Sequence, residues 1–215
     1  AYITDSEMRK INKQAIILLL TAILMLFGVH LSARPVLDFQ VEWGYSQGIY
    51  QYHQYNILTS EGSRLYSREK GFLFQPSGDI LAGVMFKPSG KSGISLMTGY
   101  AGIGNKSTAI PLMLRYSYFY KSMSSDGFFN FAESGMGFKI ATEIEKVPAI
   151  MAGIGVGYRL KLTPEINMDM LLSIRGIFDK PQIPDPEGQG FVDKSRILSN
   201  TASFYSVNAS IALSF

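Results

Sequence analysis

The sequence contains no cysteine, a single tryptophan and few charged residues. The lack of cysteine excludes a disulfide framework, a thiolate nucleophile, a Cys-based zinc site and an N-terminal lipoprotein cysteine. Charged residues make up 17%, below the roughly 25% usual in soluble domains, whereas hydrophobic residues make up 47%. The net charge is only +3 and no dense Lys/Arg cluster is present, so the composition gives nucleic-acid binding little electrostatic support.

Long hydrophobic runs are also scarce, because the single one lies near the N-terminus, in residues 15–29. It follows a basic segment, 8–13, and precedes small residues up to Ala33, which is the order of a secretory signal peptide. We therefore expect translation to start at Met8, residues 1–33 to form an extension with a cleaved signal peptide, and residues 34–215 to form the mature domain. An uncleaved anchor is the alternative, since residues 15–33 are long enough to span a bilayer.

The mature sequence carries its apolar residues in short segments with a period of two, which predicts β-strands with one apolar and one polar face. In residues 149–160, for example, Ile150, Ile154 and Val156 alternate with Gly155 and Arg159. The segment 128–140 is the least regular, and its register cannot be fixed from the pattern. The predicted strands are 36–46, 79–86, 93–101, 108–120, 128–140, 149–160, 165–178 and 204–215.

These segments are about as long as the 9–11 residues with which a tilted strand crosses a membrane. Unpaired strand edges are too costly in lipid, so the sheet must close on itself. The two longest connections, 47–78 and 179–203, fall on the same side, as in outer-membrane barrels. The expected fold is therefore all-β, a closed antiparallel up-and-down transmembrane β-barrel of about eight strands, in the outer membrane of a Gram-negative cell envelope. A soluble β-sandwich is the alternative.

Parts of the mature chain resemble known barrel sequences. Segments 110–116 (IPLMLRY), 132–138 and 153–160 resemble the PorT-like outer-membrane β-barrel family, which implies an OmpA/OmpX-like eight-stranded barrel. The C-terminal segment alternates, includes Tyr205 and ends on Phe215, and it resembles the β-signal read by the barrel-assembly machinery. That resemblance implies an assembly signal at these two residues and the assembly machinery as a partner. These are strand patterns without an active-site signature, so they support fold more than function.

An eight-stranded barrel has an interior that side chains fill. Unpaired charges there would be costly, so the inward charged residues are expected to pair across the lumen and plug it. A proton or ion path through the lumen is the alternative. On the seventh strand, Asp169 and Ser173 should face the lumen, while Met170 and Leu172 should face lipid near the bilayer middle. The predicted lumen charge network is Asp38, Glu42, Arg115, Glu133, Arg159, Asp169 and Arg175.

The first long connection combines tyrosines with adaptable polar residues, a composition that suits contact with a protein partner or surface ligand. The same residues are also compatible with two strands extended above the membrane. The last long connection carries carboxylates at 179, 185, 187 and 193, but their spacing matches no calcium-binding motif. The candidate surface-binding residues are Tyr50, Tyr52, His53, Tyr55 and Tyr66.

No group of residues has the spacing of a catalytic or metal site, and the Gly-x-Gly segments 102–104 and 153–155 do not open a helix in a nucleotide-binding unit. We therefore expect a non-enzymatic outer-membrane protein with a structural, surface-binding or secretion/envelope-complex role. Its expected contacts are outer-membrane lipid and a protein partner at the outer loops, with no cofactor and no nucleic acid. The alternatives are a narrow porin-like channel and a lipid-modifying enzyme that uses His53, Ser77 and Asp79.

Overall fold

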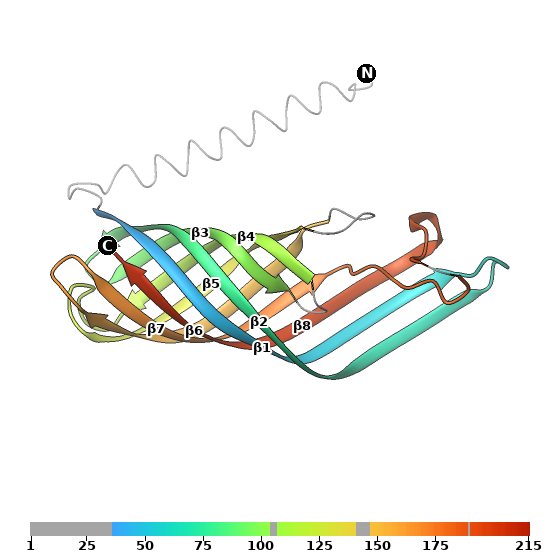
Figure 1. The fold of residues 1–215 in the computed structure, drawn as a ribbon, viewed down its shortest axis with the longest axis horizontal. Helices are drawn as coiled ribbons and strands as arrows, with labels where there is room; N and C mark the ends of the chain where they lie inside the picture. Colours follow the sequence, from blue (N-terminus) through green and yellow to red (C-terminus); the bar gives the residue numbers. More distant parts are fainter. Residues whose placement is uncertain (1–35, 104–106, 141–146, 189) are drawn as a thin grey trace, which may run out of the picture. The chain divides into compact units, whose positions relative to one another are not determined.

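The computed structural model describes residues 36–103, 107–140, 147–188 and 190–215, and the predicted signal peptide lies outside them. Within these residues, eight antiparallel strands close into a barrel, and this confirms the predicted fold class (Figure 1). A short 3₁₀-helix, η1 (Lys194–Arg196), precedes the last strand. The strands are β1 (Val36–Leu58), β2 (Arg64–Ser89), β3 (Ser92–Ile103), β4 (Ser107–Phe119), β5 (Gly127–Lys139), β6 (Ala149–Lys161), β7 (Asn167–Asp179) and β8 (Ile197–Ser214).

Apolar side chains face outward and polar side chains face inward, the reverse of a soluble protein. In β6, Ile150 and Ile154 are 54% and 67% exposed, whereas Arg159 is fully buried. The same alternation runs along β4, where Leu112 and Leu114 are exposed and Arg115 is buried. This distribution is stable only where the surrounding solvent is apolar, because water would leave the outer stripes without a favourable environment.

The strands are staggered around the barrel. One row of paired residues starts near the turn end of β2 and rises strand by strand until it reaches the long, projecting part of β1. Such a stagger accompanies the strand tilt that closure of a barrel requires. The row consists of Met85, Ser95, Arg115, Glu133, Gly153, Arg175, Ser206 and Gly48.

The first long connection is not a loop, so that prediction is wrong and its alternative is correct. β1 continues to Leu58 and β2 begins at Arg64, with a tight turn between them in which Thr59 and Ser63 are hydrogen-bonded. β8 likewise begins at Ile197, seven residues earlier than predicted, because it pairs with the continuing β1. We call residues 49–58, 64–77 and 197–201 the outer sheet. In Figure 1 these parts of β1, β2 and β8 run together past the ends of the other strands.

A β-bulge marks the point where the outer sheet leaves the barrel. The pairing of β1 with β8 shifts between Gly48 and Tyr50. The extra residue exchanges the two faces, so the outward residues are odd-numbered below the bulge, as at Tyr45, and even-numbered above it, as at Tyr52.

Apolar side chains fill the lumen at both ends. The cluster nearer the outer end contains Met113, Met151 and Phe204, and the cluster nearer the short turns contains Phe119, Phe129 and Leu171. The ion pairs at the centre of the lumen lie between these two clusters, whereas other charged pairs lie at the level of one cluster or nearer an end of the barrel. The interior is therefore a packed core, as expected for eight strands.

Candidate functional site

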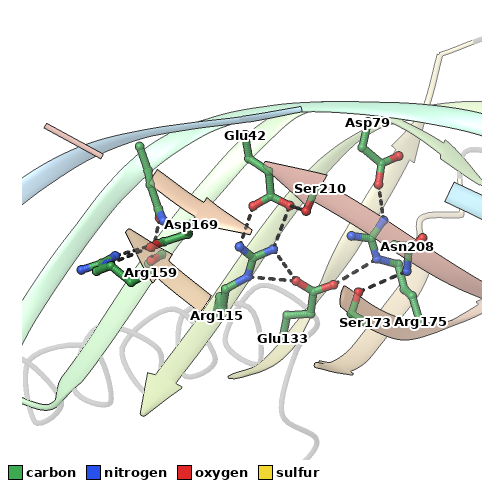
Figure 2. A network of polar contacts seen from close by, with 12 residues as sticks. Glu42, Asp79, Arg115, Glu133, Arg159, Asp169, Ser173, Arg175, Asn208 and Ser210 are labelled. Carbon is green, nitrogen blue, oxygen red and sulfur yellow. Dashed lines mark hydrogen bonds and ion pairs between the residues drawn. The ribbon is translucent and has the colours of Figure 1, made fainter. Parts of the chain in front are cut away.

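Arg115, on β4, lies at the centre of the lumen and is 3% exposed. Its Nη1 donates to Glu42 Oε2 at 2.6 Å, and its Nη2 and Nε donate to Glu133 Oε2 at 2.8 and 3.1 Å. Ser210 Oγ donates to the other oxygen of Glu42 at 2.8 Å. One guanidinium group thus joins carboxylates from β1 and β5 with charge-assisted hydrogen bonds (Figure 2).

The chain of ion pairs continues toward the outer end. Arg175 Nε donates to Glu133 Oε1 at 3.1 Å, and Arg175 Nη1 donates to Asp79 Oδ2 at 2.5 Å. Figure 2 shows the resulting chain of side chains, which runs from Glu42 on β1 across the lumen to β4 and β5 and returns by way of Arg175 on β7 to Asp79 on β2. Arg115, Glu133 and Arg175 belong to the row of paired residues described above, so the stagger of the barrel aligns them.

A second buried pair lies nearer the short turns. Arg159 binds Asp169 through two hydrogen bonds, Nε to Oδ1 at 2.7 Å and Nη2 to Oδ2 at 2.6 Å. Its Nη1 also donates to the carbonyl oxygen of Met123, and its guanidinium carbon lies 4.5 Å from the centre of the Phe119 ring. This arginine therefore ties β6 and β7 to the turn between β4 and β5.

Glycines of β6 make room for this interior. A Cβ atom on Gly155 would lie 2.4 Å from the ring of Phe131, and one on Gly157 would lie 2.2 Å from the ring of Phe129. At Gly153 a Cβ would lie 3.0 Å from a carboxylate oxygen of Glu133. The Gly-x-Gly pattern of this strand is thus a requirement of packing between β5 and β6, as in other strands where a neighbour approaches closely.

All seven predicted lumen residues lie inside the barrel, but they do not form one network. Six belong to the two ion-pair groups above, whereas Asp38 pairs with Lys87 at the inner end. Asp79 is the last member of the ion-pair group that begins at Glu42. Near the outer end of the barrel, Lys139 pairs with Asp179 at 2.6 Å. The sequence reasoning did not assign Asp79, Lys87, Lys139 or Asp179 to the lumen. The alternation at Asp79 is a usable signal, because in the predicted strand 79–86 it falls on the face opposite the apolar residues Ile80 and Val84, which face outward.

The outer mouth of the barrel contains a cavity of about 330 Å³. Its lining includes Ser46, Gln75 and Ser206, and also Leu73, Ile177 and Phe204 of the outer apolar cluster. The cavity therefore ends on packed apolar side chains above the ion pairs.

This architecture is similar to that of a solved outer-membrane protein. OprG from Pseudomonas aeruginosa aligns with a TM-score of 0.54 at 11% identity, over 84% of this chain and 97% of OprG. The fold is that of an outer-membrane β-barrel. The Neisserial surface protein NspA (10% identity, 82% and 97% coverage) and the N-terminal barrel of OprF from P. aeruginosa (11%, 85% and 100%) align with TM-scores of 0.41 and 0.40. No protein-family model and no curated protein matches the sequence.

The surface of this outer-membrane barrel agrees with its localisation. Exposed aromatic side chains form two belts, as interfaces on both sides of a membrane require. Between the belts the outward stripes consist of residues such as Leu114, Ile154 and Ile174. In the described part of the chain, no helix is long and apolar enough to cross a membrane. The outer belt contains Tyr45, Tyr100, Phe178 and Tyr205, and the inner belt contains Tyr116, Tyr118, Tyr120, Phe128 and Phe215, with half-buried Tyr158 against Phe128. Trp43, expected in the outer belt, is exposed but is connected through Ile211 and Met170 to Tyr158, so it lies nearer the middle of the outward surface.

The outer sheet separates the candidate surface-binding residues into two groups. Tyr50, Tyr52 and Tyr66 lie on its outward face, the face continuous with the lipid-facing side of the barrel. His53 and Tyr55 lie on the opposite face, where the two rings are 5.1 Å apart and His53 Nε2 is 3.0 Å from Asn200 Oδ1. The five residues therefore do not form one surface.

The last outer loop is fastened to the tip of the outer sheet. Ile57, Ile183 and Val192 form a small buried cluster between them. Arg196 Nε donates to the carbonyl oxygen of Leu58 at 2.8 Å, and its other nitrogens pair with Asp185 and Glu187. These contacts hold the loop against the tip of the outer sheet.

Glu187 completes this attachment. Its Oε2 accepts a hydrogen bond of 2.7 Å from the backbone N–H of Ser60 in the hairpin turn, and it pairs with Arg196 at 2.7 Å. The hydrogen bond from Ser60, followed by the charge of Arg196, lowers the pKa of Glu187 below its ordinary value of 4.5. The pKa of Asp193 is also lowered, because its carboxylate accepts from Ser195. These carboxylates bind protein donors, and no cluster suited to a metal ion occurs among the described residues.

The three residues of the lipid-modifying alternative, His53, Ser77 and Asp79, do not lie close together. Gly78 lies beside Gly44, whereas His53 is nine residues farther along β1, which corresponds to roughly 30 Å at about 3.3 Å per residue. His53 therefore lies far from Ser77 and Asp79, and Asp79 is held by Arg175. The geometry gives these residues no shared chemistry.

Proposed function

We propose that this chain is a non-enzymatic, non-conducting outer-membrane barrel that anchors the outer sheet at the cell surface for recognition of a protein partner. The observation that carries the proposal is the chain of ion pairs from Glu42 to Asp79 across the lumen. Packed apolar clusters on both sides of it further support a lumen without a continuous polar path. The narrow-channel alternative requires such a path.

The outer sheet supplies the recognition surface in this proposal. β2 pairs with β3 only from Asp79 toward its turn, while β2 itself begins at Arg64. Among the described residues, no strand pairs with this projecting part of β2 on the side away from β1. A free strand edge offers backbone donors and acceptors to an extended segment of another protein, a recurrent mode of recognition.

The PorT-like resemblance fits a role in a secretion or envelope complex, and that family membership remains part of the proposal. We also propose Tyr205 on β8 and Phe215 directly after it, both exposed, as the signal for the barrel-assembly machinery. Phe215→Ala should refold in detergent like the wild type but reach the outer membrane of cells in smaller amounts. Equal losses in both settings would indicate a role in stability alone.

Conductance in planar bilayers tests the closed lumen. The purified full-length mature protein should produce no stable current steps, whereas a general porin measured in the same chamber provides the positive control. Reproducible unitary steps from the wild-type barrel would contradict the proposal and favour the channel.

Site-specific photo-crosslinking in intact cells tests the free edge. A photoreactive residue at Ser67, on the projecting part of β2, should give a discrete protein adduct, whereas one at Lys91, exposed in an inner turn, should not give the same adduct. Excess unlabelled protein with the outer sheet should compete for the partner, and a barrel without that sheet should not. Adducts that form equally at both positions would refute recognition by the edge.

A further inference from the structure

The outward face of the outer sheet changes from apolar to basic along a single strand. From the barrel upward, β2 presents Ile80, Phe74 and Phe72, which are 63%, 85% and 78% exposed. The next outward residues are Lys70 and Arg68, both exposed. The lipid-facing stripe of β2 therefore continues beyond the barrel and ends in two cations.

The aromatic belt locates this change at the membrane surface. Tyr205 of the outer belt contacts Tyr50, with ring centres 6.4 Å apart, and Tyr50 contacts Phe72 edge to face at 6.1 Å. Lys70 and Arg68 follow Phe72 by two and four residues, about 7 and 13 Å along a strand. Because strands tilt by about 40°, they lie roughly 5 and 10 Å above Phe72. Lipid headgroups occupy about 5–8 Å on each side of the hydrocarbon. With Phe72 at the edge of the hydrocarbon, Lys70 therefore lies among the headgroups and the backbone of Arg68 lies just above them.

The charge of this face is not neutralised by the protein. The outward residues beside Lys70 and Arg68 on β1 and β8 are uncharged, and Glu69 alternates to the other face. Within the described residues no carboxylate pairs with either cation, whereas every lumen arginine is paired. Arg68 lies over the ring of Tyr52, at 5.8 Å from its centre, which holds the guanidinium group along the sheet. Cations above exposed phenylalanines match the phosphate and acyl chains of an anionic lipid.

We infer that Arg68 and Lys70 form a binding site for the phosphate of a phosphorylated glycolipid of the outer leaflet, whose acyl chains lie against Phe72 and Phe74. The site fixes the outer sheet against the membrane surface. An acidic protein segment is less suited to this face, because the phenylalanines continue the stripe that already contacts lipid. The inference does not depend on the closed lumen or on a protein partner.

Binding of lipid A to the full mature barrel in zwitterionic detergent tests the site. Native mass spectrometry should detect a bound copy of lipid A, and the dephosphorylated lipid should bind at least about tenfold more weakly because its charge-assisted hydrogen bonds are lost. Arg68→Gln/Lys70→Gln should weaken lipid A binding to a similar extent. Lys91→Gln/Lys121→Gln, which changes the net charge equally at exposed inner turns, should not weaken it.

Two further measurements test whether the acyl chains contribute to binding and whether the phosphate belongs to a lipid. Phe72→Ser/Phe74→Ser should weaken lipid A binding, and inorganic phosphate alone should not compete. Effective competition by inorganic phosphate would replace the lipid with a free anion and overturn the inference.

Compact migration on cold SDS gels shows that each variant is folded. If a variant does not fold, the wild-type protein still tests the inference, through its binding of phosphorylated and of dephosphorylated lipid A. Equal binding of these two lipids overturns the inference. So does unchanged lipid binding by Arg68→Gln/Lys70→Gln together with loss of the protein adduct at Ser67, which would assign the basic face to the protein partner.

Discussion

Arg115 neutralises two buried carboxylates at once, so its loss leaves both without their shared partner. Removing one member of a buried ion pair is far more damaging than the net contribution of the pair, because the remaining charge stays desolvated. We predict that Arg115→Ala lowers the free energy of unfolding by about 3–5 kcal/mol. Urea titration of the barrel in lipid vesicles measures this change.

Glu42→Gln is the matched comparison. The central group of ion pairs contains three carboxylates, those of Glu42, Glu133 and Asp79, and two guanidinium groups, those of Arg115 and Arg175. It therefore has one excess negative charge. Removing the Glu42 charge balances the chain, and the amide can still accept from Arg115. The loss should therefore be clearly smaller than for Arg115→Ala. A larger loss would mean that the excess charge is compensated by a group outside this chain.

Position along β7 should determine the cost of a charge on its outward face. Met170 faces lipid as predicted, but it pairs with Tyr158 of the inner belt and so lies nearer the interface than the bilayer middle. Ile174, 58% exposed and paired with Ile154, lies closer to the middle. We predict a loss of about 2–4 kcal/mol for Ile174→Arg and about 0–1 kcal/mol for Met170→Arg in vesicle refolding. The reverse order would place the hydrocarbon slab nearer the short turns.

Among the strands, the sequence was most informative where one face meets lipid. The pattern located β3, β4, β5, β6 and β7 to within about two residues, because an apolar outward face and a filled lumen impose a period of two. β5 obeys the same rule, but outward Asn130 and Ser134 and inward Phe129 and Phe131 concealed it. Lys139 could not be assigned to the lumen while this register was unknown, and Lys87 lies just past the predicted end of its strand.

The outer sheet escaped prediction for a different physical reason. Beyond Gly48 no lipid enforces an apolar face, and the β-bulge exchanges the faces, so Tyr50 and Tyr52 continue no stripe that is visible in the sequence. Its strands are specified by pairing between β1, β2 and β8, which are distant in sequence. The contacts of Arg196 with the hairpin tip are likewise tertiary and have no local signature.

The attachment of the last loop to the hairpin tip should depend on pH. Because the folded state lowers the pKa of Glu187, ionised Glu187 stabilises the attachment above its ordinary value of 4.5, and this stabilisation is lost as the pH falls through the lower, folded-state value. We predict that the amide of Ser60 loses protection from hydrogen exchange on acidification below pH 4.5, and in Glu187→Gln already at neutral pH.

The amide of Gly62 provides the internal control for this measurement. It donates to the carbonyl oxygen of Thr59 within the same turn, at 3.0 Å, and does not contact Glu187. Its protection, corrected for intrinsic exchange rates, should not follow the titration. Parallel loss at Ser60 and Gly62 would show that the whole hairpin turn opens and that Glu187 is not the cause.

For the whole molecule, closure depends on the seam between β1 and β8. Phe39 and Phe215 exchange two backbone hydrogen bonds, 2.8 and 3.0 Å, and the pairing continues from Gln40 and Ser214. A closed ring has no edge from which detergent can unzip it. The folded barrel should therefore migrate compactly on cold SDS gels and shift on heating, with a strand-dominated circular dichroism spectrum.

Two deletions at different positions test whether closure of the ring, and not the number of strand residues, protects the barrel from detergent. Removing residues 211–215 takes away the β8 partners of Val41 and Trp43 as well as the Phe39 contact, so it should abolish the compact form. Replacing residues 51–71 with a short Asn-Gly turn deletes more of the chain but leaves the ring intact, since Gly48 already lies beside Leu73 and Gln75. That variant should keep the compact form and its shift on heating. If it loses them while the C-terminal truncation keeps them, the stability of the barrel resides in the outer sheet, and the closed ring is not what protects it from detergent.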